Sequence, residues 1–211
     1  MNKFDLRFQK TEELIINAFL KVAAGSSFEQ IRIKDICAVA MISRNAFYAH
    51  YADKYELLES ICESLKEKMI LGLTPVMVQK MANHQLNEST DWCIDMIYEN
   101  REILKTLSHC VPERLRRLLQ DVFITGTLEA LYENPQEILR DPLLNMGTIA
   151  ISNLLIGCVV QWLDTMDEVS RDEMVTFVKL YMHEPCIILY RKISAHPEIK
   201  ERKPEKKRGD Q

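Results

Sequence analysis

The side chains best suited to recognition chemistry stand together in the run from Ser43 to His50. Ser43 is a typical helix N-cap, because its hydroxyl can accept a hydrogen bond from a free backbone N–H of the first turn. Arg44 and Asn45 follow it, and a guanidinium can bind guanine through two hydrogen bonds while an amide can pair with adenine. Ala46 next to them could contact a thymine methyl group or permit close approach. The chemistry that this run supports is binding to the base edges of DNA.

The usual catalytic and metal-binding arrangements are missing from the sequence. Six cysteines are scattered without a CxxC pair, which is typical of small buried side chains in a reducing compartment. His109 and Cys110 are neighbours, but adjacent residues diverge around a helix axis and make a poor metal site. We find no Ser-His-Asp or Cys-His set, paired-carboxylate motif or glycine-rich phosphate loop. The sequence therefore predicts no enzyme, no metal and no cofactor.

The charge distribution agrees with a local DNA-binding surface on an acidic protein. The net charge is −4, yet from residue 30 to residue 54 four Lys or Arg stand against two Asp or Glu. A second basic stretch, with eight against four, runs from Arg191 to the end. This pattern favours specific over indiscriminate DNA binding. The opening MNKFDLRFQK lacks the apolar core of a signal peptide, so we expect a cytoplasmic location.

The elements that position this run are all helical, since no sustained strand alternation occurs. A first helix carries apolar residues 14–22, short helices follow at 33–40 and 43–50, and Asp53 caps a long helix ending near Gly72. Further amphipathic helices are expected at 93–107, 112–123, 143–164 and 171–192, where Pro185 should kink the last one. We expect about nine helices. Two short helices joined by a tight turn form a helix-turn-helix, whose second helix can enter the major groove.

Two segments of the chain closely resemble the TetR family of transcriptional regulators. They are KTEELIINAFLKVA and FEQIRIKDICAVAMISRNAFYAHYADKYELL, and some fifteen positions agree with the family signature in type and spacing. The resemblance implies an N-terminal three-helix DNA-binding domain at residues 1–54. A helical ligand-binding and dimerisation domain would follow at 55–193. The basic tail at 194–211 has no apolar periodicity, so we expect it to be disordered.

The resemblance and the residue chemistry together give a set of expected DNA contacts. In the family, the positions of Tyr48 and His50 commonly touch DNA, and Lys54 sits beside a phosphate. The alternatives are that Arg44 and Lys54 are solvated charges and that His50 only caps a helix C-terminus. Tyr51 is a better packing residue than a contact, and Arg7 is a less certain candidate than Thr11. The full set is Thr11, Lys34, Ser43, Arg44, Asn45, Ala46, Tyr48, His50 and Lys54.

Two positions depart from the family pattern. Met41 occupies the turn position where the family usually has glycine, and a left-handed backbone there costs a non-glycine residue about 1 kcal/mol. Either the turn is built differently or the strain is tolerated. Ile33 replaces a common Ser or Thr, so one backbone hydrogen bond to phosphate is expected to be missing.

The middle and last helices carry the expected ligand pocket and dimer interface. The stretch from Leu143 to Leu163 is apolar nearly all round, but its polar residues argue against a membrane span. Gly157 and Ser152 would allow close helix approach. The last two helices should dimerise, with Leu180, Ile187, Ile188 and Tyr190 on the second of them. Candidate pocket residues, each of which could equally be plain core, are Trp92, Met96, Tyr98, His109, Met146 and Trp162.

Three functions are compatible with these observations. The first is a homodimeric repressor that binds an inverted-repeat operator in double-stranded DNA and is released by an unknown small-molecule effector. The second is a DNA-binding protein of the same fold without an effector, acting as an activator, a chromosome-organising factor or a partner-controlled adaptor. A cavity among the middle helices would favour the first. The third, a helical enzyme that kept its helix-turn-helix, has no supporting motif.

Overall fold

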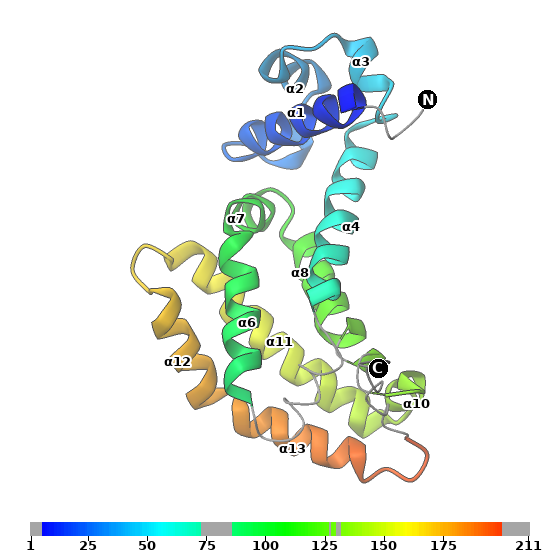
Figure 1. Cartoon of the computed structure of the whole chain (residues 1–211), viewed down its shortest axis with the longest axis vertical. Helices are drawn as coiled ribbons and strands as arrows, with labels where there is room; N and C mark the ends of the chain where they lie inside the picture. Colours follow the sequence, from blue (N-terminus) through cyan, green and yellow to red (C-terminus); the bar gives the residue numbers. More distant parts are fainter. Residues whose placement is uncertain (1–5, 73–85, 127, 130–131, 200–211) are drawn as a thin grey trace, which may run out of the picture. The chain divides into compact units, whose positions relative to one another are not determined.

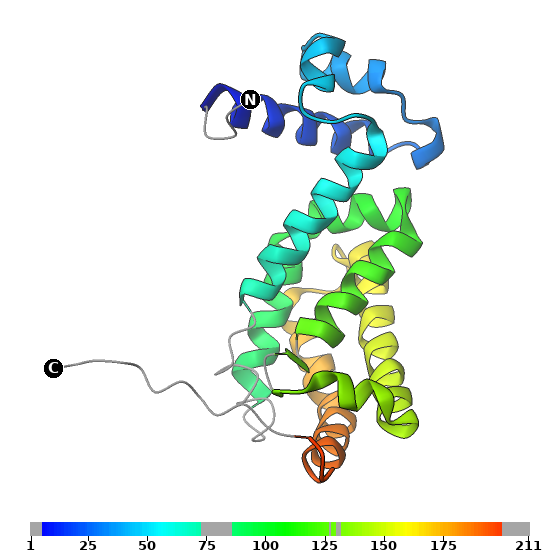
Figure 2. The ribbon, with the colours of Figure 1, turned by 90° about the vertical axis from the view of Figure 1, so that its right-hand side faces the viewer.

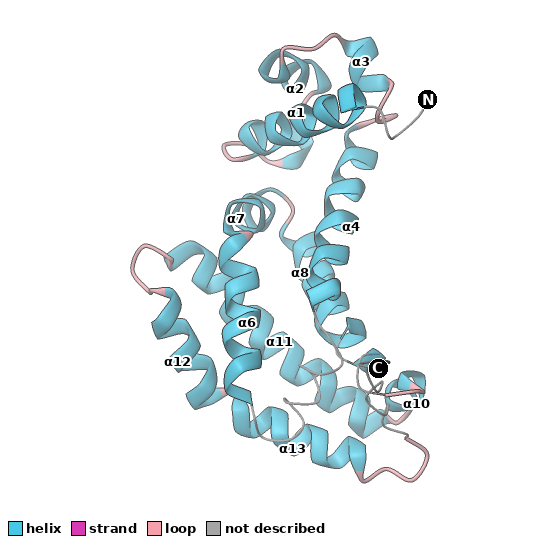
Figure 3. Ribbon diagram, viewed as in Figure 1, coloured by secondary structure: helices cyan, strands magenta, loops and turns pink. Residues whose placement is uncertain are grey.

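The regular structure of the protein is helical throughout its described residues (Figures 1 and 3). The computed structural model describes residues 6–72, 86–126, 128–129 and 132–199. The expectation of an all-α fold is confirmed. Eleven α-helices occur in these ranges, two more than expected. Two of the expected helices are each broken into two.

The helices of the N-terminal half are α1 (Leu6–Ala23), the 3-10 turn η1 (Phe28–Gln30), α2 (Ile33–Ala40), α3 (Arg44–Tyr48) and α4 (Lys54–Gly72). Those of the second half are α6 (Leu86–Glu99), α7 (Arg101–Cys110), α8 (Pro112–Asp121), the π-helical turn η2 (Val122–Gly126), α10 (Pro135–Arg140), α11 (Pro142–Thr165), α12 (Arg171–Tyr181) and α13 (His183–Ser194).

The chain divides into two compact units. The first contains residues 1–67 and 101–118, and the second contains residues 68–100 and 119–211. The first unit therefore includes, beyond residue 54, most of α4, all of α7 and the beginning of α8. The helix α4 is continuous across residues 54–72, so one element contributes residues to both units (Figures 1 and 2).

The core of the first unit forms where the apolar faces of short amphipathic helices meet. Helix α1 packs against α2 and α7. Ile15 and Phe19 of α1, Ile36 of α2 and Phe47 of α3 are each fully buried. Burying a side chain of this size contributes about 1.5–3 kcal/mol to folding. These contacts hold α2 and α3 in place although neither is long enough to be stable alone.

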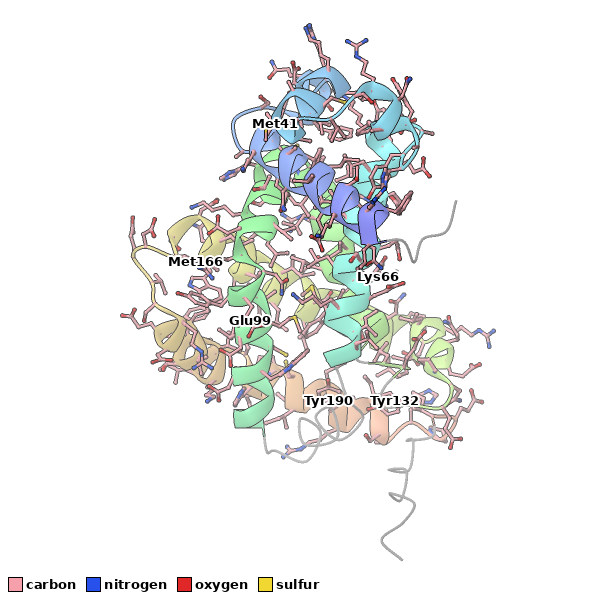
Figure 4. All side chains as sticks on the ribbon, turned by 45° about the horizontal axis from the view of Figure 1, so that its top comes forward. Met41, Lys66, Glu99, Tyr132, Met166 and Tyr190 are labelled. Atoms are coloured by element: carbon pink, nitrogen blue, oxygen red, sulfur yellow. The ribbon has the colours of Figure 1, made fainter. Side chains whose placement is uncertain are left out.

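The turn between α2 and α3 is built around Met41, which lies at its surface (Figure 4). Met41 has φ 55° and ψ 41°, so the expected left-handed backbone is present without glycine. The Met41 N–H donates to the carbonyl of Ala38, and the Ile42 N–H donates to the carbonyl of Cys37 at 3.0 Å. This pair of bonds is a Schellman motif, which satisfies the last carbonyls of α2.

The N-termini of the next two helices are capped as the sequence predicts. The Ser43 Oγ accepts a hydrogen bond from the Ala46 N–H at 3.1 Å and starts α3. The Asp53 carboxylate accepts from the N–H groups of Tyr55 and Glu56 at 2.8 and 2.9 Å and starts α4. Each cap is worth about 1 kcal/mol.

Two helices of the second half are interrupted for local chemical reasons. The expected helix at 93–107 breaks at Asn100, whose side-chain amide donates to the carbonyl of Met96 at 2.7 Å and competes with the helical backbone. The expected helix at 171–192 breaks between Tyr181 and His183. Pro185 has no N–H for the carbonyl of Tyr181, so the helix ends there instead of kinking, and Pro185 lies in the first turn of α13.

The second unit has two packed regions. Helix α12 packs against α6 and α13, and α11 packs against α10, α13 and η2. Tyr132 and Tyr190 lie together in the core beneath α10 and α11 (Figure 4). Ile199 joins this cluster, and the Glu198 carbonyl accepts from the Asn134 side chain at 2.7 Å. The first residues of the expected disordered tail are thus packed, because the tail begins with an apolar anchor; residues 200–211 lie outside the described residues.

Helix α11 is long and apolar enough to cross a membrane by length and composition, yet only 22% of its most apolar window is buried within the chain. Its buried polar residues Thr148 and Ser152 donate hydrogen bonds back to carbonyls of the same helix, those of Leu144 and Ile149. Leu143, Met146, Ile149 and Leu154 of this helix are exposed in the described part of the chain.

Replacing Met41 by glycine should raise the free energy of unfolding by about 1 kcal/mol, because glycine adopts a left-handed backbone without strain. The Met41 side chain is 90% exposed, so its removal forfeits little burial. Urea denaturation measures the change. Met41→Ala, which keeps the Cβ atom, is the matched control and should show no such gain; equal stability of the two variants would contradict the strain at this turn.

Candidate nucleic-acid interface and cavity

The N-terminal end of α3 presents polar side chains to solvent. Ser43, Arg44 and Asn45 are exposed there, and Tyr48 is 53% exposed one turn further along. Ala46 is half-buried between them. Phe47, by contrast, is fully buried and forms ring contacts with Tyr51. The helix therefore hides one apolar face in the core and directs its polar face outward.

Two expected contacts lie on neighbouring helices of the same unit. Lys34 is exposed on α2, and Thr11 is half-buried on α1. The Thr11 hydroxyl donates its proton to the carbonyl of Arg7 at 2.9 Å. In this arrangement its oxygen can still accept a hydrogen bond, but the hydroxyl cannot donate another one. Arg32, the exposed residue that precedes α2, was not in the expected set. Its positive charge beside Lys34 is the signal that could have included it.

His50 follows α3 and packs against the first helix. Its ring stacks on Phe8 with centroids 3.8 Å apart, and its Nδ1 atom is buried without a hydrogen-bond partner. Burial lowers the pKa of His50, against a smaller raising effect of the Glu12 charge. His50 is therefore a neutral ring at pH 7 that holds α1 against the end of α3.

Lys54 points into the protein. Its ammonium group donates to the carbonyls of Phe28, Ile31 and Glu29 at 2.8, 3.1 and 3.2 Å and lies 4.7 Å from the centre of the Phe28 ring. An ammonium has three protons, so none remains for a phosphate in this arrangement. The expected phosphate contact does not follow from this geometry; Lys54 instead ties the start of α4 to the turn before α2.

A cavity of about 140 Å³ lies within the second unit. Its walls come from α6, α11, α12 and α13, with Met69 of α4 and residues 119–123. None of the described side chains that line it is Asp, Glu, Lys or Arg. Its polar groups include Thr90 and His183, whose Oγ1 and Nε2 atoms lie 3.0 Å apart.

Two of the six expected pocket residues, Trp92 and Met96, line this cavity, and four do not. Tyr98 is exposed on another face of α6, and His109 is exposed in the first unit. Met146 is 66% exposed on the outside of α11. Trp162 is buried but donates its indole N–H to the carbonyl of Val169 at 2.9 Å, away from the cavity.

Several cavity residues escaped the sequence analysis. Thr90 precedes the expected helix at 93–107 but lies in α6, and His183 stands at a helix start that was not expected. Cys93 and Cys186 also line the cavity, and burial raises the pKa of their thiols to about 12 and about 11. Both thus remain protonated and behave as small apolar groups.

Ion pairs join α6 and α12, two of the helices that line the cavity. The Arg171 guanidinium binds both carboxylate oxygens of Asp95, at 2.7 and 2.9 Å, and Lys179 donates to Asp91 at 2.7 Å. The hydrogen bond from Lys179 is the largest cause that lowers the pKa of Asp91. These pairs join α6 to α12 and keep the charges outside the apolar cavity.

Comparison with known proteins supports a regulator. No family model matches the chain. Over 100 residues it is 26% identical to the uncharacterized HTH-type transcriptional regulator YwcC of Bacillus subtilis strain 168, covering 46% of this chain and 45% of that protein. Over 136 residues it is 23% identical to the uncharacterized HTH-type regulator YxbF of the same strain, covering 63% and 35%. The chain thus spans less than half the length of both curated relatives.

A solved structure shares the fold over most of the chain. The crystal structure of a TetR transcriptional regulator from Streptococcus agalactiae 2603V superposes with a TM-score of 0.54 and 18% identity, over 82% of this chain and 93% of that one. The chain has the TetR regulator fold. The resemblance that residues 10–58 carry in sequence therefore agrees with the fold of the chain.

The second unit of this TetR fold exposes apolar residues along its last helices. They are Leu143, Met146, Ile149 and Leu154 of α11, Phe177, Leu180 and Tyr181 of α12, and Ile188 of α13. Four residues of the expected helix at 171–192 were predicted to form a dimer interface, and two of them, Leu180 and Ile188, are exposed. Ile187 and Tyr190 are instead buried in the core of their own chain. Gly157 is exposed on α11, whereas Ser152 faces the interior.

Replacing Lys54 by methionine should lower the free energy of unfolding by about 1–3 kcal/mol, because three carbonyls lose a charged donor. Chemical denaturation without DNA measures this. Lys34→Met is the matched control, since Lys34 is exposed and its loss should change stability by less than about 0.5 kcal/mol. An unchanged stability of the Lys54 variant would show that Lys54 does not hold α4 in place.

Proposed function

We propose that the protein is a sequence-specific transcriptional regulator that reads double-stranded DNA with α3. The observation that carries this proposal is the exposed group Arg44, Asn45 and Tyr48 on a helix whose N-terminus is capped by Ser43. The N-terminal residues of the second helix of a helix-turn-helix reach base edges in the major groove. The named regulators that the chain resembles support this function.

Each exposed residue has a distinct role in this proposal. Arg44 makes a bidentate contact to guanine, and Asn45 pairs with adenine or binds a phosphate. Ala46 contacts a thymine methyl group. Tyr48 binds the backbone from the outer face of α3. Ser43 and Lys34 bind phosphates, which position the reading helix without selecting sequence. Thr11 joins them when its hydroxyl rotates away from the Arg7 carbonyl and donates to a phosphate instead.

His50 and Lys54 act differently from the exposed residues. His50, stacked on Phe8 with its Nδ1 atom buried, supports the end of α3 and offers its other nitrogen to DNA. Lys54 holds η1 and the start of α4 together through three carbonyls. Both residues keep the reading surface rigid, which raises affinity because less freedom is lost on binding.

The protein acts as a homodimer in this proposal. Exposed apolar residues recur on α11, α12 and α13, and where such residues form one patch the surface is typical of an interface. A second copy covers it through a two-fold axis, on which the same residues face each other. The axis also sets two α3 helices about one DNA turn apart, as an inverted-repeat operator requires.

The regulator is a repressor released by a small molecule that enters the cavity of the second unit. Met69 of α4 lines this cavity, while Lys54 at the other end of α4 binds the turn before α2. A ligand that binds better to a conformer with misplaced α3 helices shifts the population away from the DNA-bound form. The presence of a cavity favours this function over that of a regulator without an effector.

In vitro selection of genomic DNA fragments by the purified protein should enrich inverted repeats. Arg44→Ala should lose about 1–3 kcal/mol of discrimination at one base pair of each half-site, and the Arg44→Ala, Tyr48→Ala double variant should enrich none. Arg117→Ala, which removes an exposed arginine from α8, is the control and should select the same repeats. Equal enrichment by the double variant, or none by the native protein at moderate salt, would contradict reading by α3.

Replacing Leu180 and Ile188 by glutamate should convert the dimer to a monomer, because charges would be buried in an apolar interface. Light scattering after size exclusion measures the mass. Val39→Glu, which puts the same charge on exposed apolar surface of α2, should leave the dimer intact. A native monomer, or a dimeric double variant, would contradict the proposed interface.

A further inference from the structure

The cavity in the second unit has the size of one small ring. Its volume is about 140 Å³. An engineered apolar protein cavity of about 150 Å³ stays dry and binds benzene. The walls here are of the same kind, with Ile94, Ile156 and Val178 among their aliphatic residues and Trp92 and Phe123 supplying aromatic faces. A single six-membered ring therefore fits the space.

The charge state of the lining favours a neutral occupant. The described lining includes no carboxylate, ammonium or guanidinium group. The charged side chains that join α6 to α12 bind one another instead: Lys179 donates to Asp91, and Arg171 to Asp95. Burial lowers the pKa of His183, and the Lys179 charge lowers it further, so the ring is uncharged at pH 7. A charged ligand would lose its hydration without gaining an opposite charge.

One pair of polar side chains, Thr90 and His183, can orient a ligand in the cavity. Thr90 is 5% exposed and its Oγ1 lies 3.0 Å from the Nε2 of His183. If the histidine donates, the threonine proton is left to donate to a ligand. If the threonine donates, its oxygen still has a lone pair to accept. Both tautomers thus leave Thr90 with one hydrogen bond to offer to a neutral hydroxyl or carbonyl group.

We propose that this cavity binds a neutral, single-ring molecule with one hydroxyl or carbonyl group, which hydrogen-bonds to Thr90 beside His183. Trp92 and Phe123 pack on the ring, and the thiols of Cys93 and Cys186 complete the apolar wall. The action of such a molecule as the effector rests on the proposed regulatory function, but its binding does not.

Calorimetry on the full-length protein at pH 7.5 tests the inference with phenol, benzene and benzoate, three rings that differ in their polar group. Phenol should bind about tenfold more tightly than benzene, which is the effect of one neutral hydrogen bond, and benzoate should not bind. Thr90→Val should reduce phenol affinity to that of benzene. Thr176→Val, whose hydroxyl donates to its own helix at the carbonyl of Asp172, should bind phenol as the native protein does.

Val178→Phe provides a second test that does not depend on Thr90, because a larger side chain fills the cavity and should abolish binding of phenol and benzene. The inference is overturned if benzoate binds as tightly as phenol, if neither neutral ring binds, or if Thr90→Val leaves phenol affinity unchanged. Because no DNA is present, these outcomes are independent of operator recognition. Phenol that binds without releasing a selected DNA fragment would support the ligand class and refute the effector mechanism.

Discussion

The chain reverses between α2 and α3 through one left-handed residue, Met41, and the placement of α3 depends on this turn. Its backbone bonds to the carbonyls of Ala38 and Cys37 end α2, and Ser43 then caps α3. Phe47 is fully buried and anchors α3 to the core. A helix of five residues has almost no stability of its own, so its direction comes from the turn, the cap and the buried ring together.

A second set of contacts holds the start of α4 to the same core. The Lys54 ammonium donates to the carbonyls of Phe28, Glu29 and Ile31, in and just after the 3-10 turn η1. At the other end, Lys68 donates to the Asn100 side chain, and Asn100 in turn donates to the Met96 carbonyl. Met96 and Met69 both line the cavity. Hydrogen bonds therefore hold α4 at Lys54 within the first unit and at Lys68 within the second.

Sequence reasoning succeeded where a residue's role depends on its immediate neighbours. The caps by Ser43 and Asp53, the strained Met41 and the packing role of Tyr51 follow from local chemistry, and the structure has all of them. It could not give the partners of a side chain that depend on distant contacts. The positive charge of Lys54 at a helix start resembles a phosphate site, and only the fold brings the carbonyls of residues 28–31 to it.

Contacts between residues distant in sequence also decide which side chains line the cavity and which are exposed at the proposed interface. Helix α11 is apolar nearly all round, so its sequence does not reveal which face turns inward; Met146 lies outside and Ile156 lines the cavity. Trp92 and Trp162 were both expected in the pocket, but Trp162 donates its indole N–H to the Val169 carbonyl. Thr90 escaped notice because its polar neighbours in the sequence are typical of a loop.

Hydroxyl-radical footprinting of the protein on a selected DNA fragment tests the central claim most directly. If two α3 helices read DNA from a two-fold dimer, the protected sugars should form two equivalent patches on one face of the duplex, about one helical turn apart. A single protected patch, or uniform protection without symmetry, would contradict the account and point to a monomer or to binding that does not read sequence.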